Sequence, residues 1–157
     1  MGNQHTDYEL IRNTLAIYPF AVDSKDWSAV QSVFTEDARI HFTFLGTAGE
    51  MRGPIALLAF IQRAAHNTHS QHAITTQRIE VTGSDSAEAT TYMAVTHVAD
   101  ANHRQKGEVH YAWGKVVDRL VKRPVDTDGT LAWRVQERHV YEQLPSMGEL
   151  KLFREGH

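Results

Sequence analysis

Residues 70–98, SQHAITTQRIEVTGSDSAEATTYMAVTHV, carry the clearest structural signal in the chain. Apolar and polar residues alternate through residues 70–81 and again through residues 86–98, on either side of a turn signal, Gly-Ser-Asp. Two further strand-like runs follow, at residues 108–121 and 131–142. The sequence therefore predicts four long strands in an antiparallel meander, a kind of sheet that twists and curls as it grows.

The first of these strands contains a change of phase. His72 shares its face with Ile74, whereas the later apolar residues, Ile79 and Val81, lie on the other phase. Such a slip predicts a β-bulge between the two segments, and bulges often lie beside active sites because they re-aim a side chain. The alternative is a strand that begins near Thr75, with His72 in a preceding loop.

Three helices are expected before this sheet. Residues 6–9 form a capping box, a Thr followed three residues later by Glu, and an apolar stripe at helical spacing continues from it. Pro19 is expected to kink this helix or to end its regular part. Asp26 suits the cap of a second short helix, and Pro54 suits the first turn of a third. Between the second and third helices, residues 39–45 alternate as a strand.

These elements give an α+β pattern. We expect three N-terminal helices packed on a strongly curved, mostly antiparallel sheet, which together form a cone-shaped α+β barrel that encloses a pocket. The 157 residues suit a single domain, residues 1–157, because no repeat or linker divides them.

Composition excludes several kinds of chemistry. The chain has no cysteine, which rules out disulfides, thiolate metal sites and cysteine nucleophiles. The net charge is -3 and no basic cluster is present, which argues against nucleic-acid binding. The first residues lack the apolar run of a signal peptide, and no stretch is long enough to span a membrane, so we expect a cytoplasmic protein. The ten histidines favour proton transfer, because imidazole exchanges protons near neutral pH.

Strand alternation indicates which polar side chains face the core. His97 is the only ionisable residue in its row, which otherwise holds Ala89, Thr91, Met93 and Val95. It is either a proton-transfer residue or a core histidine satisfied by a backbone carbonyl. In the next strand, Tyr111 and Trp113 face one way and His110 the other. Two aromatic rings on a concave face would form a flat wall for a ring-containing substrate.

The last strand offers a candidate acid. Glu137 shares its phase with Trp133 and Val135, so a partly buried carboxylate with a raised pKa is one interpretation. The alternative is a surface ion pair with Arg138 or Arg39.

A metal site is a further alternative. His66, His69 and His72 are spaced by three and would share one face of a helix, but the chain from Ser70 onward is strand-like, which splits the set. We therefore expect neither a metal nor another cofactor.

Four segments resemble the scytalone dehydratase family, in the same order along the chain. They are Asp23-Ser24-Lys25-Asp26-Trp27, Arg39-Ile40-His41-Phe42, Gln71-His72-Ala73-Ile74 and Val95-Thr96-His97. The resemblance covers nearly the whole chain, with little identity outside the first segment. It implies the SnoaL-like, or nuclear-transport-factor-2-like, superfamily of small cone-shaped proteins.

The resemblance also implies roles for individual residues. His72 and His97 would be an acid–base pair: one neutral imidazole takes a proton next to a carbonyl, and the other, protonated, gives one to a departing hydroxyl. Asp23 would orient one of these histidines and favour its working tautomer. Such an elimination needs no metal or nucleotide.

Two departures from the family pattern point to a different substrate or reaction. Val22 and Phe42 replace a tyrosine pair that holds a water on the substrate carbonyl in the family. Tyr111 and Trp113 replace a polar Ser and Asn. Tyr18 or Tyr111 is a candidate substitute for the missing tyrosines.

Arg39 and Glu137 are rival catalytic candidates in such a variant, although alternation puts Arg39 on the opposite face from Phe42.

We expect a cofactor-independent isomerase, cyclase or dehydratase that acts by histidine acid–base catalysis on a hydrophobic, ring-containing secondary-metabolite intermediate. The alternative is a non-catalytic binding or accessory subunit with the same fold. We expect no nucleic-acid or membrane partner, and a homo-oligomer, most simply a dimer formed through the outer sheet face. The substrate-binding candidates are Tyr18, Arg39, Phe42, Tyr111, Trp113 and Glu137.

Overall fold

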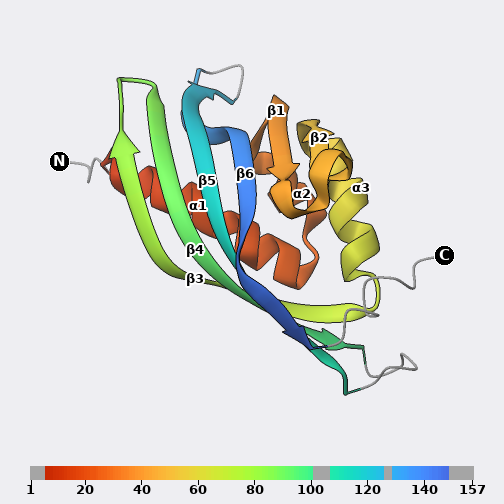
Figure 1. Cartoon of the computed structure of the whole chain (residues 1–157). Coiled ribbons are helices and arrows are strands. Elements are labelled where there is room, and N and C mark those ends of the chain that lie inside the picture. Colours follow the sequence, from red (N-terminus) through yellow and green to blue (C-terminus); the bar gives the residue numbers. More distant parts are fainter. Residues whose placement is uncertain (1–5, 101–106, 126–128, 149–157) are drawn as a thin grey trace.

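A computed structural model of the protein describes residues 6–100, 107–125 and 129–148. Within these ranges the chain forms three α-helices, a short 3-10 segment and six strands (Figure 1). The helices are α1 (Asp7–Ser24), α2 (Trp27–Ser32) and α3 (Gly53–Ala65), and the 3-10 segment is η1 (Thr43–Gly49). The strands are β1 (Phe34–Phe42), β2 (Glu50–Arg52), β3 (Thr68–Val81), β4 (Ser86–Ala99), β5 (Val109–Pro124) and β6 (Leu131–Gly148).

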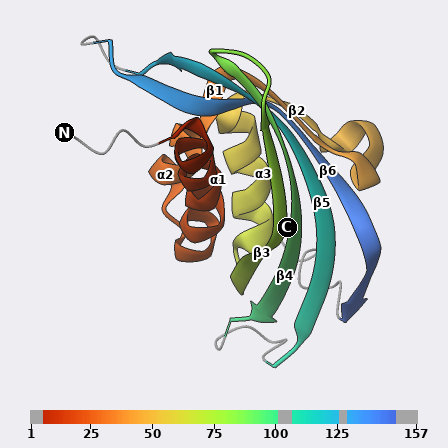
Figure 2. The same ribbon diagram turned by 90° about the vertical axis from the view of Figure 1, so that its left-hand side faces the viewer.

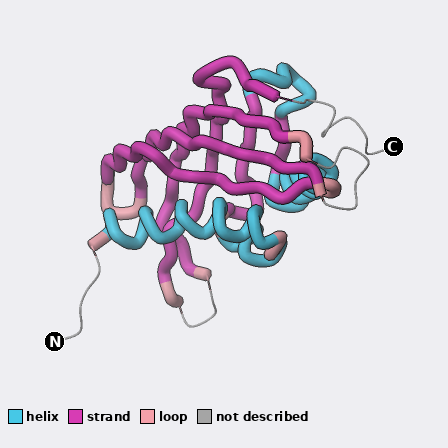
Figure 3. The backbone as a smooth tube through the Cα atoms, turned by 90° about the horizontal axis from the view of Figure 1, so that it is seen from below, coloured by secondary structure: helices cyan, strands magenta, loops and turns pink. Residues whose placement is uncertain are grey.

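The six strands form one curved sheet in the order β2-β1-β6-β5-β4-β3. Strands β3 to β6 are an antiparallel meander, and β1 joins it by pairing in parallel with β6. The three α-helices lie together on the concave side of the sheet (Figure 2). Helix α1 runs alongside the edge strand β3 (Figure 3). The predicted α+β architecture is therefore confirmed, with a sheet that curls without closing.

Helix α1 begins at the predicted capping box. The backbone N–H of Thr6 donates to the Glu9 carboxylate at 2.8 Å, and the Thr6 hydroxyl accepts from the Glu9 backbone. The helix continues through Pro19 to Ser24, because Tyr18 and Val22 on either side of the proline are both buried in the core.

The two shorter helices also begin where predicted. The Asp26 carboxylate accepts the backbone N–H of Ala29 and caps α2, and Pro54 lies in the first turn of α3. Strand β1, in contrast, begins and ends earlier than the predicted residues 39–45. Its end is fixed by a compact turn in η1, where Gly46 has a φ of 58°.

The β-bulge in β3 is confirmed. The register between β3 and β4 shifts between Ile74 and Thr76, so that Thr75 is the extra residue. His72 is consequently part of the regular strand, where it pairs with Val95 of β4.

The core fills the space between the helices and the concave face of the sheet. Trp133 and Phe34 are its largest fully buried side chains, and each contributes roughly 1.5–3 kcal/mol through burial. The indole of Trp133 donates to the Asp7 carboxylate at 2.9 Å, which ties β6 to the start of α1. No helix in the described part of the chain has the length and apolar character needed to cross a membrane.

Candidate active site

The C-terminal end of α1 brings Asp23 onto β3. The Oδ1 atom of Asp23 lies 2.6 Å from Nδ1 of His72 and accepts the Ser70 hydroxyl at 2.8 Å. The Oδ2 atom accepts the backbone N–H of His72, also at 2.8 Å. A carboxylate in this position favours the imidazole tautomer that carries its proton on Nδ1, which leaves Nε2 as the basic atom. We refer to these two residues as the Asp23–His72 dyad.

The dyad is sheltered but not sealed. The His72 side chain is 13% exposed and that of Asp23 is 23% exposed. Burial alone would raise the pKa of Asp23, but the hydrogen bonds from the His72 ring, the His72 backbone and Ser70 outweigh this effect and lower the pKa. Asp23 is therefore a carboxylate at neutral pH, as an orienting group must be.

His97 lies beside the dyad on the next strand. The ring centroids of His97 and His72 are 5.7 Å apart and the rings are nearly perpendicular. Burial, with a smaller contribution from the neighbouring His72, lowers the pKa of His97 to about 3. His97 is therefore uncharged at neutral pH, and this does not support the role of a protonated acid that the family resemblance implies.

A buried ion pair, which was not predicted from the sequence, lies on the same concave face. The Arg138 guanidinium donates twice to Asp118, at 2.7 Å through Nε and at 2.9 Å through Nη2. Its central carbon lies 4.6 Å from the ring centroid of Tyr18, and burial raises the pKa of the Tyr18 phenol. The phase of β5 was the available signal, since Asp118 alternates with the apolar Val116 and Leu120.

Tyr18 connects this ion pair to the dyad. Its ring lies 6.5 Å from that of His72, in an edge-to-face arrangement. A narrow gap near these groups is too small to hold a water molecule, and its lining is mostly apolar with the ion pair as its polar end. Its lining residues are Leu15, Ile74, Thr91, Met93, Val116, Asp118 and Arg138.

Comparison with known proteins assigns the family. A family model described as a SnoaL-like domain matches residues 3–139. The chain belongs to the SnoaL-like family. The predicted membership of the SnoaL-like superfamily is thereby confirmed. No curated protein sequence gives a significant match.

Solved structures share the fold at low identity. A proposed aromatic ring hydroxylase of Novosphingobium aromaticivorans is 22% identical, with a TM-score of 0.76, over 94% of this chain and 96% of that chain. A proposed scytalone dehydratase of the same bacterium is 14% identical, with a TM-score of 0.73, over 91% and 87%. The hexachlorocyclohexane dehydrochlorinase LinA-type3 of Novosphingobium barchaimii is 14% identical, with a TM-score of 0.72, over 91% and 90%. At these identities the likeness establishes the fold alone.

The predicted aromatic wall does not lie in this SnoaL-like site. His97 pairs directly with His110 across β4 and β5, so His110 shares the concave face with His97. Tyr111 and Trp113 consequently project from the outer face, where their rings stack at 6.5 Å and Tyr111 is 44% exposed. The prediction assigned the two larger rings to the inward face and was wrong, because the inward positions of this part of β5 hold His110 and Ala112.

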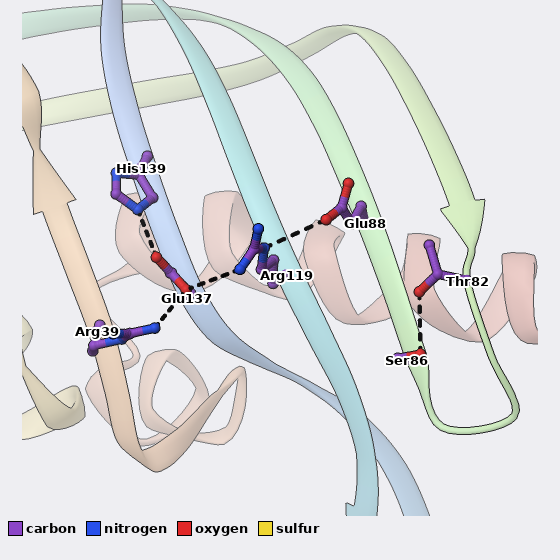
Figure 4. A network of polar contacts seen from close by, with 7 residues as sticks. All are labelled: Arg39, Thr82, Ser86, Glu88, Arg119, Glu137 and His139. Atoms are coloured by element: carbon purple, nitrogen blue, oxygen red, sulfur yellow. Dashed lines mark hydrogen bonds and ion pairs between the residues drawn. The ribbon is translucent and has the colours of Figure 1, made fainter.

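Glu137 and Arg39 also lie on the outer face of the SnoaL-like sheet, away from α1 (Figure 4). The Glu137 carboxylate lies 2.8 Å from Arg39 and 2.9 Å from the His139 ring. Its pKa is lowered, chiefly by the hydrogen bond from His139, so of the two interpretations the raised pKa is wrong and the surface ion pair, formed with Arg39, is confirmed. The reason is a second bulge, since Glu137 pairs with Arg119 while Val135 pairs with the adjacent Leu120.

The remaining sequence candidates lie apart from the dyad. Phe42 belongs to β1, which three strands separate from β3, and packs its ring 5.0 Å from that of Phe60 in α3. His69 is on the opposite face of β3 from His72 and lies 3.1 Å from Asp100. Of the predicted site residues of this SnoaL-like protein, the structure brings together Asp23, His72, His97 and Tyr18.

Proposed function

We propose that the protein is a lyase or isomerase in which His72 removes a proton from a carbon atom of the substrate. The single observation that carries the proposal is the 2.6 Å contact between the Asp23 carboxylate and Nδ1 of His72. It leaves Nε2 as the base, and the carboxylate stabilises the imidazolium that forms when this atom takes up a proton.

Removal of a proton by His72 can lead to two reactions, an elimination or an isomerisation. In an elimination, the C–H bond breaks, its electron pair forms a double bond to the neighbouring carbon, and a leaving group departs from that carbon with its own bonding pair. In an isomerisation, the electron pair is delocalised onto an adjacent carbonyl, and the imidazolium of His72 returns the proton at a different carbon. Both routes use one base, which suits a site where His97 is uncharged.

The surroundings favour a mostly apolar substrate with one polar group. The walls of the nearby space come from apolar side chains, and its polar end is the Asp118–Arg138 pair next to Tyr18. The lining side chains must separate to admit a ring, and a ring compound with a single carbonyl, hydroxyl or halogen substituent then matches this distribution of apolar and polar groups. An intermediate of secondary metabolism is one such compound. The fold relatives named as dehydratase and dehydrochlorinase perform eliminations, which supports the same class of reaction here.

We also propose that two copies associate through the outer sheet face. Several large apolar side chains project there and are more than a third exposed, and their burial between two copies would remove them from water. They are Tyr92, Tyr111, Tyr141 and Leu144.

The test of the proposed function measures C–H exchange directly. The protein is incubated in D2O with a panel of cyclic ketones, cyclic alcohols and halogenated rings, and loss of the C–H signals and appearance of alkene signals are followed by proton NMR. We expect exchange or elimination with the wild type and none with His72→Gln. His69→Gln is the matched control, since His69 is 70% exposed on the other face of the same strand. Equal activity in wild type and His72→Gln would contradict the proposal.

A further inference from the structure

A third buried histidine lies next to the candidate site. His110, at the start of β5, is only 6% exposed. Its ring centroid lies 5.8 Å from that of His97, at an interplanar angle of 45°. His72, His97 and His110 therefore form a row across β3, β4 and β5, which we call the histidine row.

The strand register fixes this row. Ser70 of β3 pairs with His97, and His97 pairs with His110, so these three side chains point to the same concave face. His72 lies two residues after Ser70 in the same strand and therefore points to that face as well. Ser70 donates to Asp23, which places the carboxylate at the β3 end of the row. The opposite neighbour of His110 on β6 is Gly148, which has no side chain to contribute.

Charge is distributed unevenly along the histidine row. Asp23 and the Tyr18 phenol face it from α1, and Glu108 precedes His110 at the start of β5. Further along the concave face, the charges of Asp118 and Arg138 are paired with each other. Burial lowers the pKa of His110, as it lowers that of His97. Protonation of His97 and of His110 is therefore disfavoured, and two protonated rings at these distances would repel each other.

We propose that His110 is a positioning residue of this site, whose ring holds His97 in one orientation and one neutral tautomer, so that the proton of the reaction stays on His72. The effect on catalysis rests on the proposed function, whereas the effect on His97 does not. A ring at 5.8 Å with its own dipole restrains the neighbouring imidazole through shape and through the placement of its nitrogen atoms.

The test compares two variants of His110 in protein labelled with nitrogen-15 at histidine. His110→Phe keeps a ring of similar size without nitrogen atoms, and His110→Gln keeps a donor and an acceptor at similar reach. Ring nitrogen shifts are recorded between about pH 5 and 8, the range in which an ordinary histidine titrates. His69→Gln serves as the control for removal of a histidine outside the row.

We expect a single neutral tautomer of His97 in the wild type, a mixture of tautomers in His110→Phe, and restoration in His110→Gln. Where a substrate has been found, kcat should fall between about 10- and 100-fold in His110→Phe with little change in KM, as expected when the ring next to the base is displaced. Unchanged His97 signals in His110→Phe, or identical signals in the Phe and Gln variants, would overturn the proposal. If the Phe variant does not fold, His110→Asn replaces it, because the Asn side chain is shorter than that of Gln and does not reach His97. Identical His97 signals in His110→Asn and His110→Gln would then overturn the proposal.

The outcomes separate this proposal from the proposed function. A changed His97 tautomer in a protein that exchanges no C–H proton would support the role of His110 and reject the proton abstraction. Activity lost in His72→Gln, with His97 unaffected by every change at His110, would do the opposite.

Discussion

Nδ1 of His72 and Oδ1 of Asp23 lie 2.6 Å apart, although the two residues are 49 positions apart in the sequence. The contact exists because α1 ends directly over β3 and because Ser70, two residues before His72, holds the same carboxylate oxygen. The carboxylate is thereby fixed by three hydrogen bonds, and the imidazole is held in one orientation.

The Asp23→Asn variant should lose most activity while it remains folded. An amide has nearly the same shape but no charge, so it neither stabilises the imidazolium nor secures the working tautomer, and kcat should fall by about 100-fold or more. The free energy of unfolding should fall by about 1 kcal/mol, since an Asn accepts fewer hydrogen bonds than the carboxylate does. Steady-state kinetics and urea unfolding measure the two effects.

Asp26→Asn is the matched control for this change. Asp26 is exposed and caps α2, a role that Asn fills equally well, so neither activity nor stability should change measurably. A similar loss of activity in both variants would mean that the charge of Asp23 has no special role.

Stability should decrease in mild acid because of His97. Its pKa is about 3 in the folded protein and near its ordinary value of 6.5 in the unfolded chain. Below pH 6.5 the unfolded chain therefore binds a proton that the folded protein does not, and stability falls as the pH drops from 6.5 toward 3. One such group contributes up to about 1.4 kcal/mol per pH unit in this window.

The His97→Gln variant tests this assignment. The free energy of unfolding, measured by urea at several pH values, should decline less steeply with acid in the variant than in the wild type. His69→Gln, which removes an exposed histidine, should leave the wild-type slope unchanged. Parallel curves for wild type and His97→Gln would show that His97 titrates normally in the folded state.

Alternation in the sequence was sufficient to predict β3 and β4 and the inward direction of His97, and one of its two interpretations placed His72 within β3. Strand β4 is regular from Ala89 to His97, and the bulge of β3 is visible as a change of apolar phase. The carboxylate partner of His72 came from the family resemblance, because no local pattern records which helix residue will lie over which strand.

The errors fall where the apolar phase is weak. In β6 the bulge that turns Glu137 outward brings Arg138 inward, and a charged residue at an inward position gives no apolar signal. In β5 the inward positions near the site hold His110, Ala112 and Gly114, which are less apolar than the outward aromatic residues. Val116, later in the same strand, is buried and shares the face of His110, Ala112 and Gly114. The alternation of the whole strand therefore indicates the inward face better than its aromatic residues do.

Separating the buried ion pair should destabilise the protein strongly. Arg138 and Asp118 are 3% and 1% exposed, so Arg138→Met leaves an isolated carboxylate in the core and should cost about 3–5 kcal/mol. The double variant Arg138→Met/Asp118→Leu should recover most of that loss, because no charge is left buried. Arg39→Met is the control: it removes an ion pair in which Arg39 is 67% exposed, and should cost at most about 1 kcal/mol. Urea unfolding of the wild type and these three variants measures the losses, and equal stability of the single and double core variants would contradict this account.

The outer face should control assembly and leave the site unaffected. Tyr111→Lys and Leu144→Lys place charges among the exposed apolar residues of the sheet, so the proposed dimer should dissociate at least about tenfold more readily, as measured by sedimentation velocity. The KM of either variant, measured as a monomer, should stay close to that of the wild type because Tyr111 lies on the opposite face of β5 from His110. Phe20→Ser is the control, since Phe20 is 77% exposed but belongs to α1 on the helical side. Dissociation caused by Phe20→Ser and not by the sheet variants would place the interface on the helices.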